Sequence, residues 1–494
     1  MSLATIFADR QMVVGKIEPA IFGSFVEHLG RCVYTGIFEP THPEADSDGF
    51  RTDTLELVKG LNVPIVRYPG GNFVSGYNWR DGIGPRENRP ARLDLAWSTT
   101  ETNQFGVDEF MKWCKKAGTD PMMAVNLGTG TPQEAGSLVE YCNYPGGSEL
   151  SDLRKANGSE LPYGIKTWCL GNEMDGPWQI CGMSAEGYAD KALAAAKMMH
   201  WVDPSIKLVA CGSSGREMPT FPEWDRIVLD KLYEQADYIS MHRYYWQDGS
   251  EEDFFASSHD MNEFIQTIKA VADYVRAKHR SSKIMSISFD EWNVWYQNKQ
   301  GEAHWAQAPR ILEDRYSLKD ALVFSGMLNT LVNNCDRVKI ACLAQLVNVI
   351  APIFTEPGGA AIKQSIYYPF QLLSSHGNGV ALSHITKCDT FSSRHGEVKI
   401  LSSSIGYNEA DKELSLYLVN YSASKVELSL ELRGFGDLSA TECLVLEGNL
   451  DDANTFERPD LVKPKEGEKP ATKGEHAVAA LSPLSYTVLR FKHE

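Results

Sequence analysis

The chain has 494 residues, of which 43% are hydrophobic and 23% charged, a composition typical of folded globular proteins that excludes a disordered, collagen-like or coiled-coil chain. Its length corresponds to about three domains, or to one large barrel with a smaller companion. Asp and Glu outnumber Lys and Arg by 65 to 48, so the formal charge is −17, which argues against nucleic acid or an anionic membrane surface as the main partner.

Short apolar or β-branched runs recur between residues 20 and 370, separated by longer segments with helical periodicity. The eight predicted strands cover residues 20–25, 63–68, 122–126, 165–170, 207–211, 238–242, 283–289 and 339–346. Predicted helices between them include residues 107–117, 185–200, 261–279 and 317–333. Alternating strands and helices indicate parallel β/α units, and eight units predict an α/β fold, a (β/α)8 TIM barrel, which we expect to be the catalytic domain over residues 19–374.

The pattern changes after about residue 375, where strand-like segments follow one another without a convincing helix. The predicted strands there cover residues 397–404, 413–420, 426–432, 441–446 and 486–491. They predict a C-terminal antiparallel β-sandwich over residues 375–494. Residues 4–14 also alternate, so we expect an N-terminal strand within residues 1–18 to join this sandwich. The polar stretch 449–475 predicts a long exposed loop.

The ten cysteines are scattered, without a C-x-x-C pair or the short spacings of a zinc site. This pattern favours a reducing compartment. Residues 1–15 lack the charged, apolar and cleavage regions of a signal peptide, and no apolar stretch reaches the roughly 18 residues of a membrane span. We therefore expect a cytoplasmic protein that has no membrane partner.

Two carboxylates stand out at the ends of predicted strands, where barrel enzymes place their catalytic groups. Glu173 follows the fourth strand in the sequence CLGNEMD, and Glu291 follows the seventh in FDEWNVW. Strands four and seven lie on opposite sides of an eight-stranded ring, so the two side chains can face each other across its mouth. Two facing carboxyl groups among aromatic side chains are typical of glycoside hydrolases, in which one protonates the leaving oxygen and the other attacks or stabilises the anomeric carbon.

The chain resembles the α-L-arabinofuranosidases of glycoside hydrolase family 51 at motifs that span nearly its whole length. These motifs are FGSFVEH at 22–28, RYPGGNF at 67–73, GNEMDGPW at 171–178, DEWNVWY at 290–296 and NTFE at 454–457. The resemblance implies a retaining, exo-acting arabinofuranosidase in which Glu173 is the general acid/base and Glu291 is the nucleophile. It implies an arabinofuranoside oligosaccharide as substrate and a homo-oligomer, often a hexamer. Because the chain lacks a metal-ligand or nucleotide motif, we expect no cofactor and no metal.

The resemblance also implies roles for residues around this pair. Substrate-binding roles fall to Glu27, Asn72, Asn172, Tyr244, Gln345, Trp97, Trp178 and Trp295, and supporting roles to Arg67 and His242. Other interpretations remain open for several of them. Glu27 could form a salt bridge with Arg31 or Arg67, His242 could be a satisfied core residue, and any single tryptophan could serve core packing.

Other classes of protein fit less well. A metal-dependent hydrolase would need H-x-H at the first strand or H-E-x-x-H, and a nucleotide enzyme would need a glycine-rich phosphate loop; neither motif is present. A carbohydrate-binding protein without activity would usually have replaced one of the two glutamates. A related retaining xylosidase or endoglucanase stays open, because a shared fold does not fix the substrate.

Overall fold

The structure is a computed structural model that describes residues 2–297 and 304–493. Within these residues, eight parallel strands close into a barrel, and the last of them pairs back to the first. In ring order they are β2 (Gly23–Phe25), β3 (Ile65–Tyr68), β6 (Asp120–Val125), β7 (Thr167–Leu170), β8 (Lys207–Ala210), β9 (Tyr238–Tyr245), β10 (Ser286–Val294) and β11 (Val338–Leu343). Each predicted strand overlaps one of these strands, so the predicted (β/α)8 barrel is confirmed.

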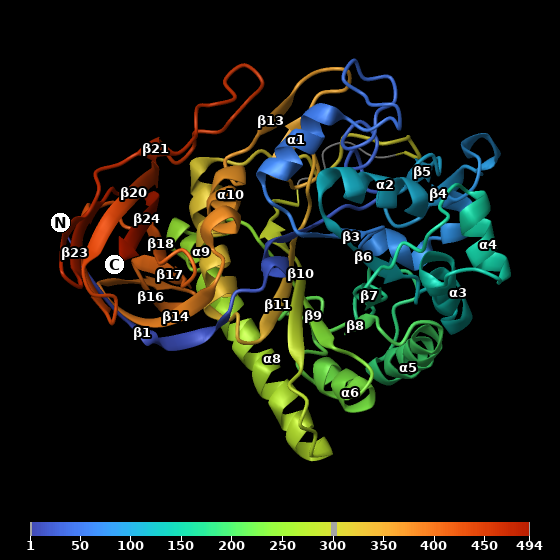
Figure 1. The fold of residues 1–494 in the computed structure, drawn as a ribbon, viewed down its shortest axis with the longest axis horizontal. Helices are drawn as coiled ribbons and strands as arrows, with labels where there is room; N and C mark the ends of the chain where they lie inside the picture. Colours follow the sequence, from blue (N-terminus) through green and yellow to red (C-terminus); the bar gives the residue numbers. More distant parts are fainter. Residues whose placement is uncertain (1, 298–303, 494) are drawn as a thin grey trace.

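A helix follows each barrel strand, and these helices surround the ring (Figure 1). They are α1 (Thr52–Gly60), α2 (Val107–Ala117), α3 (Pro132–Asn143), α5 (Ala185–Val202), α6 (Glu223–Leu232), α8 (Ser257–His279), α9 (Leu318–Asn333) and α10 (Tyr367–His376), with α4 (Glu149–Ala156) and α7 (Glu251–Phe255) as additions. Local sequence sets their ends. Thr131 and Glu134 form a capping box at the start of α3, and Gly118 ends α2 with a φ of 75°. In the described part of the chain, no helix is long and apolar enough to cross a membrane.

Short elements decorate the loops of the barrel. They are the strands β4 (Arg92–Asp94), β5 (Thr99–Glu101), β12 (Ile353–Thr355) and β13 (Ala361–Lys363), and the 3-10 helices η1 (Pro19–Phe22), η2 (Asn72–Gly76), η3 (Trp79–Gly82) and η4 (Arg86–Asn88). The pairs β4–β5 and β12–β13 are antiparallel hairpins. Both belong to segments that follow the carboxyl ends of barrel strands, the end at which barrel enzymes build their sites.

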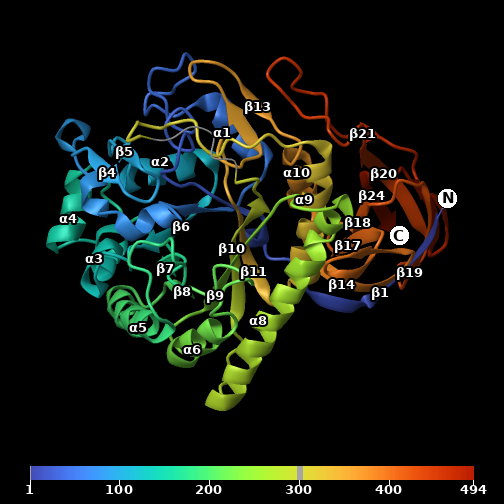
Figure 2. The ribbon, with the colours of Figure 1, turned by 180° about the vertical axis from the view of Figure 1, so that it is seen from behind.

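The second domain is one continuous sheet that lies beside the barrel and holds both chain ends (Figures 1 and 2). In the described residues its order is β21 (Lys465–Glu466), β20 (Leu438–Leu446), β24 (Ser485–His493), β18 (Glu413–Asn420), β17 (Leu401–Asn408), β14 (Val380–Lys387), β1 (Ser2–Lys16), β19 (Val426–Arg433), β23 (His476–Leu481) and β22 (Ala471–Lys473). A separate hairpin joins β15 (Thr390–Ser393) and β16 (Gly396–Lys399). The sheet curls until β20 contacts β22, and its inner face encloses a second apolar core that includes Ile6, Leu416 and Leu430.

The N-terminal strand occupies the middle of this sheet. β1 pairs antiparallel with β14 and parallel with β19, so the sheet is antiparallel except at that one pairing. Most of the stretch 449–475 is exposed, as its composition predicts, but its first part is anchored. Asn454 is buried, its Nδ2 donates to the Lys363 and Val462 carbonyls, and the Asp452 carbonyl accepts from Leu318 N. This part of the stretch docks on the start of α9 instead of extending into solvent.

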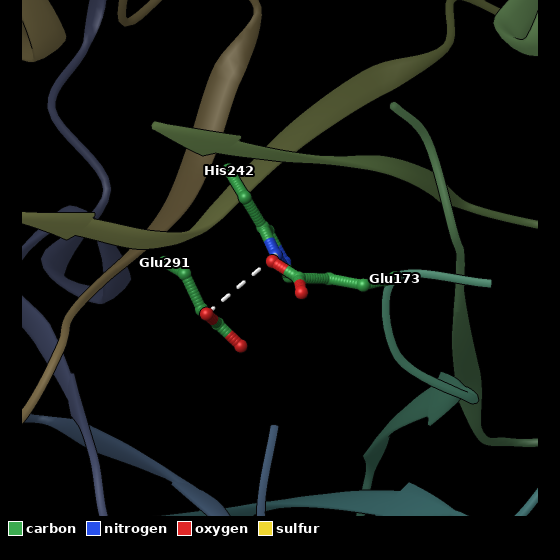
Figure 3. Close-up of side chains that lie close together, drawn as sticks. All are labelled: Glu173, His242 and Glu291. Carbon is green, nitrogen blue, oxygen red and sulfur yellow. Dashed lines mark hydrogen bonds and ion pairs between the residues drawn. The ribbon is translucent and has the colours of Figure 1, made fainter. Parts of the chain in front are cut away.

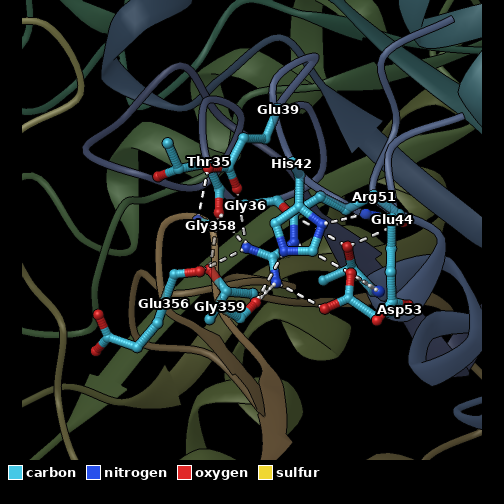
Figure 4. Close-up of polar contacts among 12 residues, drawn as sticks. Thr35, Gly36, Glu39, His42, Glu44, Arg51, Asp53, Glu356, Gly358 and Gly359 are labelled. Atoms are coloured by element: carbon cyan, nitrogen blue, oxygen red, sulfur yellow. Dashed lines mark hydrogen bonds and ion pairs between the residues drawn. The ribbon is translucent and has the colours of Figure 1, made fainter.

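A buried arginine ties together two long segments beside the barrel mouth (Figure 4). Arg51, at the end of the segment that follows β2, has no exposed surface. It donates to the carboxylates of Glu39 and Asp53 at 3.0 and 2.6 Å, and to the carbonyls of Glu356 and Gly359 at 2.8 and 2.6 Å. The last two belong to the β12–β13 hairpin region, so a single guanidinium holds the two segments in register.

We expect Arg51→Met to lower the free energy of unfolding by about 3–5 kcal/mol, because it leaves Glu39 and Asp53 without their buried cation. Urea denaturation followed by tryptophan fluorescence measures this loss. The matched control is Lys59→Met, since Lys59 pairs with Glu56 on an exposed face of α1, where the change should stay within about 0.5 kcal/mol. Equal effects of the two substitutions would contradict the role given to Arg51.

Candidate active site

The predicted site residues gather at the carboxyl ends of the barrel strands. Glu173 lies just after β7 in a turn where Gly171 and Glu173 both have positive φ, 86° and 46°. The left-handed region is uncommon for a glutamate, and strained backbone of this kind concentrates at functional sites. On the other side of the ring, Glu291 lies in β10 directly beside His242 of β9. The fold therefore brings the two glutamates to one end of the barrel.

A register shift in β10 turns two consecutive carboxylates into the barrel. Ser288 pairs with Ser240 of β9, and Glu291, three residues later, pairs with His242, only two residues later. In a regular strand Asp290 and Glu291 would point to opposite faces. The extra residue of a bulge removes this alternation. Both side chains are consequently buried in the same cluster, 1% and 5% exposed.

Two donors fix the carboxylate of Glu291. Arg67 Nη1 donates to its Oε1 at 2.6 Å, and the Tyr244 hydroxyl donates to its Oε2 at 2.8 Å. Arg67 is itself buried, and its Nη2 donates to Asn172 Oδ1 at 2.7 Å. The Arg67 guanidinium thus links the Glu291 carboxylate to the side-chain amide of Asn172, the residue before Glu173. Its donors lie in one rigid plane, so it holds the two partners in a fixed geometry.

Glu173 accepts hydrogen bonds at both of its oxygens. His242 Nδ1 lies 2.8 Å from Oε1, and Trp178 Nε1 donates to Oε2 at 2.7 Å. Figure 3 shows Glu173 and Glu291 converging from opposite sides on His242. One oxygen of Glu173 and one of Glu291 lie within 4.8 Å of each other. Trp178 is half exposed, which places it at the rim and not in the core.

His242 lies among three carboxylates. Its Nδ1 faces Glu173 and lies 3.6 Å from Glu291 Oε2, and its Nε2 lies 3.0 Å from Asp290 Oδ1. Burial by itself would lower the pKa of His242. The charge of Glu291 and the hydrogen bonds to Asp290 and Glu173 outweigh that effect and raise the pKa to about 10. His242 is therefore in direct contact with the carboxylates of the site, and its surroundings favour the charged form of the ring.

Glu27 forms a second polar group at the same end of the barrel. Its carboxylate accepts from Phe73 N and Trp97 Nε1, both at 3.0 Å, and from Gln345 Nε2 at 3.1 Å. Burial and, next, the charge of Glu291 raise the pKa of Glu27 to about 8. The alternative of a salt bridge does not hold, because Arg31 pairs with Glu313 and Arg67 pairs with Glu291.

The remaining predicted residues connect to these groups. Asn172 Nδ2 lies 3.4 Å from Asn72 Oδ1. The Trp295 ring meets the Tyr244 ring edge to face, with 5.0 Å between centroids. All the residues singled out in the sequence thus belong to contact groups around Glu173, Glu291 and Glu27.

Sequence reasoning missed the role of Asp290. Its Oδ1 lies 3.0 Å from His242 Nε2. Its Oδ2 lies 3.8 Å from Arg67 Nε and 3.7 Å from Cys169 Sγ. The only signal was its position next to Glu291, and regular strand alternation would have turned it away from the site. A bulge leaves no clear mark in a single sequence.

Among the described residues, Glu173, His242 and Glu291 form the one group of acidic, histidine or cysteine side chains close enough to share a metal ion. In the structure His242 contacts two carboxylates directly, Glu173 at 2.8 Å and Asp290 at 3.0 Å. An imidazole in direct contact with carboxylates suits proton transfer.

Comparison with known proteins gives two matching family models, the α-L-arabinofuranosidase 1 domain over residues 57–268 and the α-L-arabinofuranosidase C-terminal domain over residues 290–485. The chain is 48% identical over 500 residues to the intracellular exo-α-(1→5)-L-arabinofuranosidase 1 of Bacillus subtilis (strain 168), covering 100% of both chains. It is also 48% identical over 475 residues to an exo-α-(1→6)-L-arabinofuranosidase of Bifidobacterium longum, covering 92% of this chain and 91% of the relative. A solved structure of a family 51 α-L-arabinofuranosidase from Bifidobacterium longum superposes with a TM-score of 0.96 at 44% identity, covering 99% of this chain and 100% of that one.

Proposed function

The chain belongs to the α-L-arabinofuranosidases of glycoside hydrolase family 51, and from this premise we propose that it removes terminal non-reducing α-L-arabinofuranosyl residues from arabinan- or arabinoxylan-derived oligosaccharides. The observation that carries the proposal is the pair Glu173 and Glu291, with oxygens within 4.8 Å of each other. Retaining glycosidases hold their carboxyl groups roughly 5–5.5 Å apart, whereas inverting enzymes leave room for a water. The spacing supports a double displacement through a covalent glycosyl-enzyme.

Glu291 is the proposed nucleophile, because Arg67 and Tyr244 fix both of its oxygens and orient the carboxylate. It attacks the anomeric carbon while Glu173 protonates the leaving oxygen. In the second step Glu173 takes a proton from water, which attacks the same carbon and releases arabinose with its original configuration. We assign Trp178, which is exposed at the rim and bonded to Glu173, to contact with the leaving part of the substrate.

The sugar hydroxyls need convergent polar partners, since a buried hydroxyl without one costs about 1–3 kcal/mol. We assign this role to Glu27, Asn72, Asn172 and Gln345, with Tyr244 at the nucleophile. Their mutual hydrogen bonds hold the acceptors and amides in place before substrate arrives. Trp97 and Trp295 are assigned to the walls of the pocket, where an apolar sugar face packs on aromatic rings.

An NMR time course of p-nitrophenyl α-L-arabinofuranoside hydrolysis tests this function. We expect the α-anomer of arabinose to appear first, before mutarotation, because double displacement retains configuration. First release of the β-anomer would overturn the double displacement. Turnover of xylosides or β-glucans in place of arabinofuranosides would overturn the substrate. Parallel assays with (1→5)- and (1→6)-linked oligosaccharides define the linkage, on which the relatives' names differ.

We further propose that the enzyme acts inside the cell, as the name of the Bacillus subtilis relative states for that protein, and that it works as a homo-oligomer. In support, the C-terminal sheet exposes the large apolar side chains of Leu3, Ile385 and Val478, which are 69%, 62% and 48% exposed. All three side chains face away from the second apolar core, so this outer face of the sheet is the one that we assign to the subunit contact. Light scattering after size-exclusion chromatography is expected to give a mass several times that of one chain; a monomer would overturn the proposal.

A further inference from the structure

His242 has a hydrogen-bonding environment that a neutral imidazole satisfies only when one of its two carboxyl partners carries a proton. Its Nδ1 lies 2.8 Å from Glu173 Oε1, and its Nε2 lies 3.0 Å from Asp290 Oδ1. A carboxylate only accepts hydrogen bonds, and a neutral imidazole has one N–H and one lone pair. In the neutral form, with both partners ionised, one nitrogen would point its lone pair at a carboxylate oxygen. Only the doubly protonated ring donates to both partners.

The contacts of Glu173 suit an ionised carboxylate. His242 Nδ1 lies beside one oxygen, and the Trp178 indole N–H, which can only donate, forms a hydrogen bond to the other. Yet the proposed acid/base must deliver a proton in the first step. The two forms, imidazolium with carboxylate and imidazole with carboxylic acid, contain the same number of protons. They differ only in the position of one proton along a 2.8 Å contact.

We propose that His242 stores, in the empty enzyme, the proton that Glu173 delivers to the leaving oxygen, so that the two residues act as one shared-proton acid. This inference rests on the proposed function. His242 touches no substrate atom in this scheme; it is a positioning residue that acts through Glu173.

The proton balance closes over one reaction cycle. The proton leaves His242 Nδ1 for Glu173 Oε1, and the Glu173 carboxyl gives a proton to the leaving oxygen as the glycosidic C–O bond breaks and its electron pair stays on that oxygen. Glu291 forms the new bond to the anomeric carbon and loses its charge. Glu173 is then a carboxylate and His242 is neutral. Water returns one proton to the pair as its hydroxyl displaces Glu291.

The other charges around His242 favour this storage. Asp290, 1% exposed, faces Nε2, and Glu291 lies 3.6 Å from Nδ1. Arg67 lies on the far side of both carboxylates, 2.6 Å from Glu291 and 3.8 Å from Asp290, and the Tyr244 hydroxyl donates to Glu291. The raised pKa of His242 agrees with this arrangement. Because the charge of Glu291 disappears in the glycosyl-enzyme, the proton is held less tightly in the step in which the pair must be a base.

The first experiment measures ¹⁵N NMR of the imidazole of His242 in the wild-type enzyme near neutral pH, assigned by the signal lost in His242→Asn. We expect the pair of shifts that marks a doubly protonated ring. A ring with one protonated nitrogen would overturn the proposal. This readout needs no substrate, so it stands apart from the failure or success of the proposed function.

The second experiment compares His242→Asn on two arabinofuranosides, one with a 2,4-dinitrophenyl leaving group, which needs no acid, and one with a methyl leaving group, which does. We expect kcat/KM to fall by about 10²-fold or more on the methyl substrate, the usual range of general acid catalysis, and by a much smaller factor on the aryl substrate. The basic limb of the kcat/KM profile, which reports the pair as a unit, should move to lower pH.

The matched control is His28→Asn, because His28 is also buried at the end of a barrel strand and also bonded to a carboxylate, Glu101 at 2.8 Å. It should change neither the ratio between the two substrates nor the position of the basic limb. Equal losses of His242→Asn on both substrates, with the basic limb unmoved, would show that His242 only orients Glu173 and would overturn proton storage.

Discussion

Replacement of Glu291 by alanine is expected to lower kcat/KM for aryl α-L-arabinofuranosides by at least about 10⁴-fold, because it removes the group that forms the covalent intermediate. Arg67 retains Asn172 and Asp290 as partners, so the fold should survive. The space left by the side chain also gives azide a route to the anomeric carbon. Attack from that face inverts the configuration, so the expected product is the β-L-arabinofuranosyl azide, identified by NMR.

Glu313→Ala is the matched control for this variant. Glu313 is as buried as Glu291, 5% exposed in both cases, and also bound to an arginine, Arg31 at 2.6 Å. Losing a buried arginine partner should destabilise both variants similarly, but Glu313→Ala should keep most of its activity and give no azide adduct. If both variants lost activity equally, or if azide gave the α-anomer with Glu291→Ala, the assignment of Glu291 as nucleophile would fail.

The barrel and its two central carboxylates could be predicted because each rests on a local and repeated signal. Eight apolar runs separated by helical segments have few folding solutions, and the carboxyl ends of parallel strands must meet at one end of the barrel. Reading the residues just after each predicted run therefore finds Glu173 and Glu291 without knowledge of any contact, although β10 itself continues through Glu291 to Val294. The helix 107–117 could be predicted with its exact bounds, because an amphipathic stripe ends at a glycine suited to positive φ.

The features that escaped prediction depend on non-local geometry. Asp290 enters the site because β10 bulges against β9, and a single extra residue in a register carries no sequence signature. Likewise, β14 and β23 were not predicted, although β14 pairs with β1 and β23 with β19. Strand preference depends on the neighbouring strands as much as on the residues themselves. The contacts of Arg51 join segments about 300 residues apart in the chain, which no local pattern encodes.

The acid/base assignment predicts a different signature for Glu173→Ala. On a methyl arabinofuranoside kcat/KM should fall by about 10²–10⁴-fold, the range of general acid catalysis. On a dinitrophenyl arabinofuranoside kcat/KM should change little, because the glycosyl-enzyme forms without an acid. Its hydrolysis becomes slow because no base activates the water, so kcat and KM should fall together. Azide needs no base, so it should restore turnover and give the α-L-arabinofuranosyl azide, the opposite anomer from Glu291→Ala.

Glu27→Gln provides the contrast that separates acid catalysis from sugar binding. Glu27 accepts from Trp97 and Gln345 and has no contact with Glu173 among the described residues. A group that binds the arabinose ring contributes equally whatever the leaving group, so Glu27→Gln should lower kcat/KM by the same factor on both substrates. If Glu173→Ala behaved in that way, and azide failed to restore turnover, Glu173 would be a sugar-binding residue and the leaving oxygen would have to take its proton from another group.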